Sequence, residues 1–318
     1  MKKSSGVLVF LALALAPAPF GCRTDHPSGP GGRISLSGAW ALYPMALKWG
    51  EEFQKIHPDI KVDIQAGGAG KGIADALSGM VDLGMVSRDV RPEEVERGAW
   101  PIAVTKDAVV ATASARNPFR ADIFSKGISQ TAFLAIWAGG RKITWGEVLG
   151  TSAREPVHVF TRSDACGAAE TWAAFLGKRQ EDLSGVGVYG DPGLADAVRR
   201  DPLGIGFNNV NFAYDAATLK PIDGLTIVPI DLDGSGAIEP GESFYAGRDE
   251  LTGAIARKAY PSPPARDLYL VAKGTPSRPV VVEFLRWILT DGQAYVPATG
   301  YIALSPEKLA EALKSIGR

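Results

Sequence analysis

Strand-like and helix-like segments alternate along the chain from residue 33, and this alternation restricts the fold more than any other feature. The strand-like segments are residues 33–38, 60–65 and 81–88, and the helix-like segments between them are residues 42–56 and 72–79. Both helix-like segments repeat apolar side chains at helical spacing. This order predicts a parallel sheet with helices on its faces. Later segments continue the alternation, so the expected fold class is α/β.

The first 32 residues differ in character from the rest of the chain. Residues 7–16 form an apolar run after a short basic start, which is typical of a secretory signal and too short to span a bilayer. We therefore interpret residues 1–22 as a lipoprotein-type signal peptide, with Cys22 as the site of lipid attachment. The alternative is an ordinary cleaved signal in which Cys22 has no role. Residues 23–32 are rich in Gly and Pro and are expected to form a flexible tether.

The composition excludes several classes of function. The net charge is −1 and Lys and Arg form no cluster, which argues against a nucleic-acid-binding protein. Cys166 is the only cysteine after Cys22, so the body can form no intramolecular disulfide. The sequence contains no H-E-x-x-H, C-x-x-C or G-x-S-x-G motif, and we expect a protein that is not an enzyme.

Four turns that each follow a predicted strand form the candidate binding site, and we call them the strand-end loops. They are residues 39–41 (AWA), residues 67–71 (GGAGK), residues 87–88 (SR) and residues 162–168 (RSDACGA). Each offers backbone N–H groups at the start of a helix, or a guanidinium, and both can bind an anion. One such loop is often only a tight turn, and one Arg is often only a surface ion pair. Four of them favour a shared anion site.

The glycine-rich loop is not a nucleotide loop. Its glycines stand at positions 67, 68, 70 and 72, which match neither the Walker A pattern nor G-x-G-x-x-G. A small anion held by backbone amides is therefore the favoured ligand.

In the order and spacing of these segments, almost the whole chain resembles the phosphate-binding solute receptors of bacterial ABC importers. The resemblance rests on residues 42–88, 134–148, 162–177, 196–214 and 260–304. It implies a two-lobed periplasmic-binding-protein fold of type II, with two hinge crossovers. The expected first lobe is residues 33–113 plus 265–318, and the expected second lobe is residues 114–264. A monomeric, extracytoplasmic receptor that delivers its ligand to a membrane permease is implied, with the N-terminal lipid as its anchor.

The resemblance places the ligand, phosphate or a related oxyanion, on thirteen residues of the strand-end loops. They are Ala39, Trp40, Ala41, Ala69, Gly70, Lys71, Ser87, Arg88, Arg162, Asp164, Cys166, Gly167 and Ala168. The family carries Ser or Thr hydroxyls at several positions where this chain has Ala or Cys. Each lost hydrogen bond removes about 1 kcal/mol, so phosphate itself is less firmly implied than the scaffold. A larger anionic solute stacked on Trp40 stays open.

Two other functions remain open from the sequence. The first is an anion-sensing scaffold on the same fold, which would pass lobe closure to a signalling partner. The second is a hydrolase or transferase with Cys166 as its nucleophile, because Cys166 lies at a helix start near Arg162.

A separate segment, residues 231–242 (DLDGSGAIEPGE), matches a twelve-residue calcium loop. The expected oxygen ligands come from Asp231, Asp233, Ser235, the Ala237 carbonyl, Glu239 and Glu242, with Gly236 at the turn. The strand-like residues before the loop argue against a full EF-hand. Calcium would act structurally, by bracing an insertion in the second lobe. The alternative is a polar surface turn.

Overall fold

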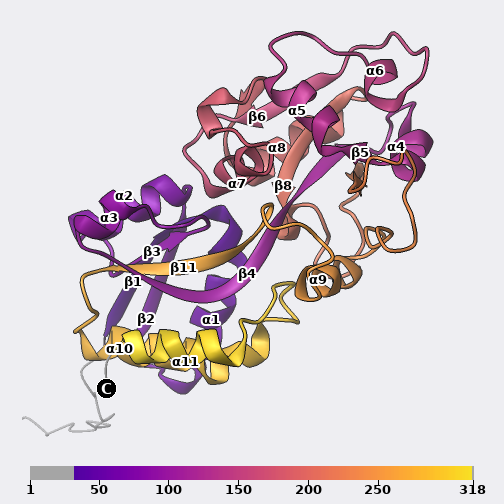
Figure 1. Ribbon diagram of the computed structural model, residues 1–318. Helices are drawn as coiled ribbons and strands as arrows, with labels where there is room; N and C mark the ends of the chain where they lie inside the picture. The colour runs from indigo at the N-terminus through magenta and orange to yellow at the C-terminus, as the bar shows by residue number, and fades with distance from the viewer. Residues whose placement is uncertain (1–31, 317–318) are drawn as a thin grey trace, which may run out of the picture.

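The computed structural model describes residues 32–316, which fold into two α/β lobes (Figure 1). The predicted signal peptide, Cys22 and residues 23–31 of the tether lie outside the described residues. Within residues 32–316, no helix has both the length and the apolar character needed to cross a membrane.

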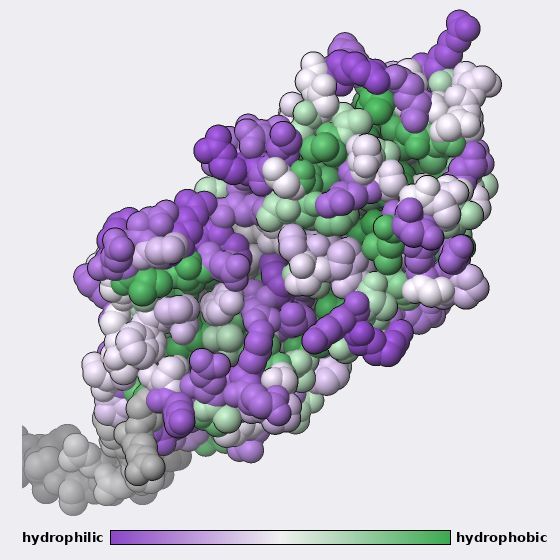
Figure 2. Space-filling model, in the orientation of Figure 1, coloured by the Kyte–Doolittle hydropathy of each residue, from purple (hydrophilic) through white to green (hydrophobic). Residues whose placement is uncertain are grey.

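The first lobe combines the beginning and the end of the described chain. Its strands are β1 (Arg33–Gly38), β2 (Lys61–Ala66), β3 (Leu83–Val86), the first part of β4 (Ala99–Ser114) and most of β11 (Ala265–Lys273). Its helices are η1 (Trp40–Leu42), α1 (Tyr43–Ile56), α2 (Ala69–Ser78), α3 (Pro92–Glu96), α10 (Pro279–Leu289), η4 (Asp291–Tyr295) and α11 (Pro306–Ser315). Hydrophilic side chains cover the outer surface in the region of α2 and α3 (Figure 2).

The second lobe is built from the middle of the chain. Its strands are β5 (Ile128–Ser129), β6 (His158–Arg162), β7 (Val186–Val188), β8 (Gly204–Asn209), β9 (Leu225–Val228) and β10 (Ile230–Asp231). Its helices are α4 (Arg120–Lys126), α5 (Gln130–Ala138), α6 (Trp145–Leu149), α7 (Gly167–Phe175), η2 (Gln180–Asp182), α8 (Gly190–Arg200), η3 (Val210–Phe212) and α9 (Arg248–Ala256).

The strand order of the main sheet is β2-β1-β3-β11-β4-β8-β6-β7, with β9 also paired to β4. β1 pairs in parallel with β2 and β3, which confirms the parallel arrangement predicted from the alternating pattern. β11 inserts antiparallel between β3 and β4. Because β1, β2 and β3 are parallel, the loops at their carboxyl ends lie at one edge of the sheet.

Two neighbouring strands carry the chain between the lobes. β4 pairs first with β11 and then with β8 and β9, and it runs from one lobe into the other (Figure 1). Its side chains pack in the first core as far as Val104 and in the second core from Ala108. On β11, Ala265 packs in the second core and Leu268 in the first. The two crossovers implied by the resemblance are confirmed, and on β4 the core changes several residues before residue 113.

Gly72 explains part of the glycine pattern. A Cβ on Gly72 would lie 2.4 Å from the Met85 carbonyl oxygen and 3.0 Å from the Gly38 Cα. Only a glycine therefore lets α2 pack this closely on β1 and β3. The close packing holds the N-terminus of α2 at the carboxyl edge of the sheet.

Candidate functional site

The strand-end loops of the two lobes meet in direct contact. The Gly70 amide donates a 3.2 Å hydrogen bond to the Ala165 carbonyl of the opposite lobe. A Cβ on Gly167 would lie 2.2 Å from the Ser87 Oγ, so α7 begins against the end of β3. The described form is thus closed, with all four loops at one junction.

The loop after β1 contributes an aromatic contact. The Ala39 amide donates to the Met85 carbonyl at 2.8 Å, and the Ala41 carbonyl accepts from the Tyr301 hydroxyl at 2.6 Å. Both alanines are buried. The Trp40 ring lies edge-on to Tyr189 and Phe212, at centroid distances of 6.3 Å, and so packs across to the second lobe. Its buried Nε1–H has no hydrogen-bond partner, which leaves one donor available at the junction.

Carbonyl groups of the protein accept hydrogen bonds from most of the backbone amides in the glycine-rich loop. The Gly67 and Gly68 amides donate to the Gly38 carbonyl at 2.8 and 3.0 Å, which fixes the loop to β1. Ala69, fully buried, is the first residue of α2. The Lys71 ammonium pairs with Asp75, four residues further along α2 in the first lobe.

Arg162 is held by two carboxylates. Its Nε and Nη2 donate to Asp164 at 2.8 and 2.6 Å, and its Nη1 donates to Asp191 at 2.6 Å. The side chain has no solvent exposure. Burial opposes the charged guanidinium, but the nearby carboxylates outweigh this effect and raise the pKa of Arg162. Arg162 therefore stays charged in a fixed orientation.

Arg88 bridges the lobes through carboxylates. Its Nη1 and Nη2 donate to Glu94 at 2.8 and 2.7 Å, and its Nε donates to Glu170 of α7 at 3.1 Å. Arg91 also donates to Glu170, at 3.0 Å. Arg88, expected from the sequence to bind the ligand or to form a surface ion pair, thus forms a buried ion pair between the lobes.

Cys166 caps α7. Its sulfur accepts from the Ala169 amide at 3.4 Å, while Gly167 and Ala168 form the buried first turn. Burial raises the pKa of the Cys166 thiol to about 12, with Arg162 acting in the opposite direction. A thiolate, the reactive form, is therefore scarce at neutral pH. This argues against Cys166 as a catalytic nucleophile.

Four further buried polar residues adjoin the site and were missed in the sequence analysis. They are Asp107, Asp191, Asn209 and Arg266. Asp191 lies three residues after β7 and Asn209 is the last residue of β8, so the strand-end argument applied to these two strands would have found them. Asp107 and Arg266 are charged residues within largely apolar strands. This was the only feature of the sequence that could have marked them as functional.

A family model described as the PBP superfamily domain matches residues 24–292. The chain belongs to the PBP superfamily. Curated proteins similar to this chain include the phosphate-binding protein PstS of Pseudomonas aeruginosa, which is 26% identical over 100% of this chain and 99% of the relative. PstS of Bacillus subtilis is 28% identical over 71% of this chain and 77% of the relative.

Solved structures agree with the fold of this PBP superfamily member. A phosphate ABC transporter substrate-binding protein with bound phosphate, from Clostridium perfringens, superposes with a TM-score of 0.69 and 23% identity. The alignment covers 86% of this chain and 100% of that one. An ABC-type phosphate transport receptor from Vibrio cholerae gives a TM-score of 0.62 and 16% identity, and covers 85% of this chain and 100% of that one.

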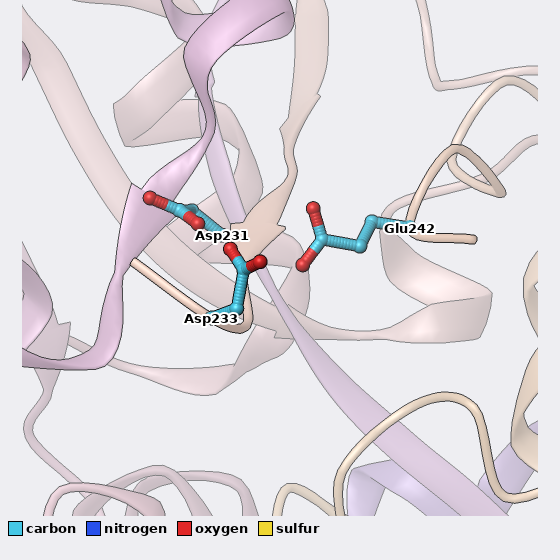
Figure 3. A group of neighbouring side chains, drawn as sticks. All are labelled: Asp231, Asp233 and Glu242. Atoms are coloured by element: carbon cyan, nitrogen blue, oxygen red, sulfur yellow. The ribbon is translucent and has the colours of Figure 1, made fainter. Parts of the chain in front are cut away.

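The loop with calcium-loop spacing lies in the second lobe of this superfamily member, away from the junction. Asp231, Asp233 and Glu242 bring one carboxylate oxygen each within 4.8 Å of one another (Figure 3). Asp231 also accepts from the Gly234 and Gly236 amides at 2.9 and 3.0 Å, which shapes the turn. The Ser235 hydroxyl donates to the Ala237 carbonyl at 3.0 Å. Glu239 is not part of the carboxylate group.

Proposed function

We propose that this PBP superfamily protein is an extracytoplasmic receptor for phosphate or a related oxyanion, which it delivers to an ABC importer. One observation carries the proposal: helix N-termini from both lobes converge with Ser87 and Arg162 at a single junction. The helix dipole and the unpaired N–H groups of a first turn favour an anion there. The phosphate-related names of the relatives support the same ligand class.

The proposed ligand contacts combine main chain and a few side chains. The first turns of α2 and α7 offer amides, Ser87 offers a hydroxyl, and Trp40 offers its indole N–H. Arg162 supplies the charge, while Asp164 and Asp191 hold its guanidinium in position. Since Ala69 and Ala168 provide no hydroxyl, selectivity rests on amide geometry more than in hydroxyl-rich relatives. Binding requires the lobes to part, admit the anion and close again.

The proposal also includes a lipid anchor and a structural calcium ion. A lipid on Cys22 would anchor a monomeric receptor to the membrane through the tether, close to its permease. Calcium would bind Asp231, Asp233 and Glu242 and brace the second lobe without touching the ligand, because carboxylate oxygens are the ligands that Ca²⁺ prefers.

Titration calorimetry with phosphate, arsenate, sulfate and molybdate tests the receptor function. We expect one of these anions to bind the wild type with one site per chain. Ser87→Ala removes a hydrogen bond to a charged ligand, worth about 1.5–3 kcal/mol. We therefore expect a dissociation constant about ten- to a hundredfold higher.

Ser125→Ala is the matched control, because Ser125 is an exposed serine on α4 in the second lobe. It should bind like the wild type. No heat from any of the four anions with folded wild-type protein would refute the receptor function. Equal affinities of the Ser87 and Ser125 variants would refute the proposed site. The alternative function, an anion-sensing scaffold, uses the same site and predicts the same anion binding. In that case a signalling partner would recognise the closed lobes.

A further inference from the structure

A buried pair of opposite charges lies where both crossovers meet. Asp107 on β4 and Arg266 on β11 are direct partners in the antiparallel ladder. The Arg266 Nη2 lies 3.8 Å from the Asp107 Oδ2. Both residues stand between the two cores, so this rung of the ladder belongs to the hinge.

Asp107 has an unusual environment for a carboxylate. The residue is 1% exposed, and neither carboxylate oxygen has a hydrogen-bond partner. Removal from water favours the neutral acid over the anion. Burial accordingly raises the pKa of Asp107 to about 7, although Arg266 acts in the opposite direction. A small change in local charge can therefore change its protonation near neutral pH.

Hydrogen bonds connect this pair to the proposed anion site. Arg266 donates to the Asn209 Oδ1 and, at 3.4 Å, to the Gly167 carbonyl in the first turn of α7. The Asn209 Nδ2 donates at 2.8 Å to Asp191, which in turn holds Arg162. A continuous buried network thus runs from the hinge to the charged group of the site.

The charges in this network are unbalanced. It contains the guanidiniums of Arg162 and Arg266 and the carboxylates of Asp107, Asp164 and Asp191. With all five groups ionised the network carries one excess negative charge, and a bound anion would add more in a site shielded from water. Among the three carboxylates, Asp164 and Asp191 accept hydrogen bonds from Arg162, whereas Asp107 accepts none. Asp107 is therefore the carboxylate that gives up its charge at the lowest cost.

We propose that Asp107 takes up a proton when an anion binds at the N-terminus of α7, so that anion binding is coupled to protonation of the hinge. This inference rests on the proposed receptor function. Protonation leaves the charge of Arg266 available to the bound anion instead of to Asp107. By linkage, the anion in turn raises the pKa of Asp107, and affinity through this group falls as the pH rises.

Other titratable and charged groups face the pair from the surrounding elements. Those acting on Asp107 or Arg266 are Asp191 on α8, Cys166 before α7, Arg162 on β6, Tyr260 before β11 and Tyr301 after η4. Burial raises the pKa of both tyrosines above 10, and that of Cys166 to about 12. All three stay neutral between pH 6 and 8.5, so Asp107 is the group that titrates in this range.

The test compares proton uptake by the wild type and by Asp107→Asn. Phosphate is titrated into each protein at pH 7.5 in two buffers of different ionisation enthalpy. Because phosphate titrates near this pH itself, the difference between the two proteins isolates Asp107. We expect the wild type to take up more protons, by a measurable fraction of one. The ratio of dissociation constants, wild type over variant, should rise between pH 6.5 and 8.5, by at most about tenfold per pH unit.

Asp267→Asn is the matched control. Asp267 is the next residue on β11, and its ion pairs are with Lys106 and Lys308. It should show the proton uptake of the wild type. Difference infrared spectroscopy on the wild type is a second readout that needs no variant, and the signal of a protonated carboxyl should grow on phosphate binding.

The outcomes separate the two proposals. Anion binding with equal proton uptake by the wild type and Asp107→Asn would overturn the coupling and leave the receptor function intact. Binding without growth of the protonated-carboxyl signal would overturn it in the same way. Failure of the wild type to bind any anion would overturn the receptor function and the coupling together.

Discussion

Cys166 has two structural roles: it caps a helix and it packs against the second core. It ends the loop after β6 and caps α7 with a sulfur, which is a weaker hydrogen-bond acceptor than a hydroxyl oxygen. It also fills space as a small apolar residue, 3% exposed, against the second core. The same burial that makes it a good packing residue suppresses its ionisation. Its chemistry therefore supports a binding site better than a catalytic one.

This environment predicts slow alkylation of Cys166. With a thiol pKa of about 12, the thiolate fraction at pH 8 is about one in ten thousand, far below that of an ordinary cysteine. In a Cys22→Ser background, iodoacetamide should label the folded protein very slowly and the urea-unfolded protein at the ordinary rate. Mass spectrometry over time measures both rates. Rapid labelling of the folded form would revive the nucleophile interpretation.

The calcium-type loop acts as an element that ties parts of the second lobe together. β10, which leads into it, pairs with β5, and the Ile238 amide of the loop donates to the Ser125 carbonyl at the end of α4. Three carboxylates gathered in one turn repel one another unless a cation neutralises them. Calcium would thus stabilise the position of α4 and β5 as well as the loop.

Thermal unfolding with calcium and with a chelator tests this bracing role. At a calcium concentration ten times the dissociation constant, binding should add about 1.4 kcal/mol to the free energy of unfolding. Asp233→Asn should reduce this gain. Asp233 is the more suitable residue because it is exposed and accepts one backbone hydrogen bond, from the Ser235 amide, whereas Asp231 accepts three. Asp59→Asn, an exposed aspartate of the first lobe, should keep the full gain; the same loss in both variants would contradict the assignment.

At the scale of the whole molecule, side-chain contacts join the two lobes. Glu170 of the second lobe accepts hydrogen bonds from Arg88 and Arg91 of the first, and the ring of Trp40 packs against the second lobe. Along the line where the lobes meet, hydrophilic side chains are visible at the surface (Figure 2). These contacts stabilise the closed form.

Glu170→Gln should shift the lobes toward an open form. The Glu170 side chain is 21% exposed, so the loss lies between that of a surface and a buried ion pair, about 1–2 kcal/mol. This corresponds to a roughly five- to thirtyfold shift of the equilibrium. Small-angle scattering without ligand should give a larger radius of gyration than for the wild type. Glu147→Gln removes an ion pair to Arg141 within the second lobe and should leave the radius of gyration unchanged. An unchanged radius for both variants would refute the role of Glu170 in holding the lobes together.

The sequence predicted the architecture better than the chemistry of the junction. Hydrophobic periodicity specifies strands and helices, and glycines such as Gly72 mark close packing, so the α/β fold and the convergence of the loops could be anticipated. Charge pairing could not be, because Arg88 finds Glu170 from 82 positions away and Arg266 faces Asp107 across a ladder whose register no local pattern reveals. The lining of the junction is determined by tertiary contacts.

The Ala165 carbonyl accepts a hydrogen bond from the Gly70 amide, as the proposed anion would. A peptide oxygen carries partial negative charge, so this carbonyl occupies a donor that a bound anion would also use. To bind this amide, the anion must displace the Ala165 carbonyl. The effective concentration of the carbonyl is set by the hinge and does not depend on the external anion concentration. Such an internal competitor raises the apparent dissociation constant by a constant factor, so half-saturation shifts to a higher anion concentration while the binding curve keeps its single-site shape.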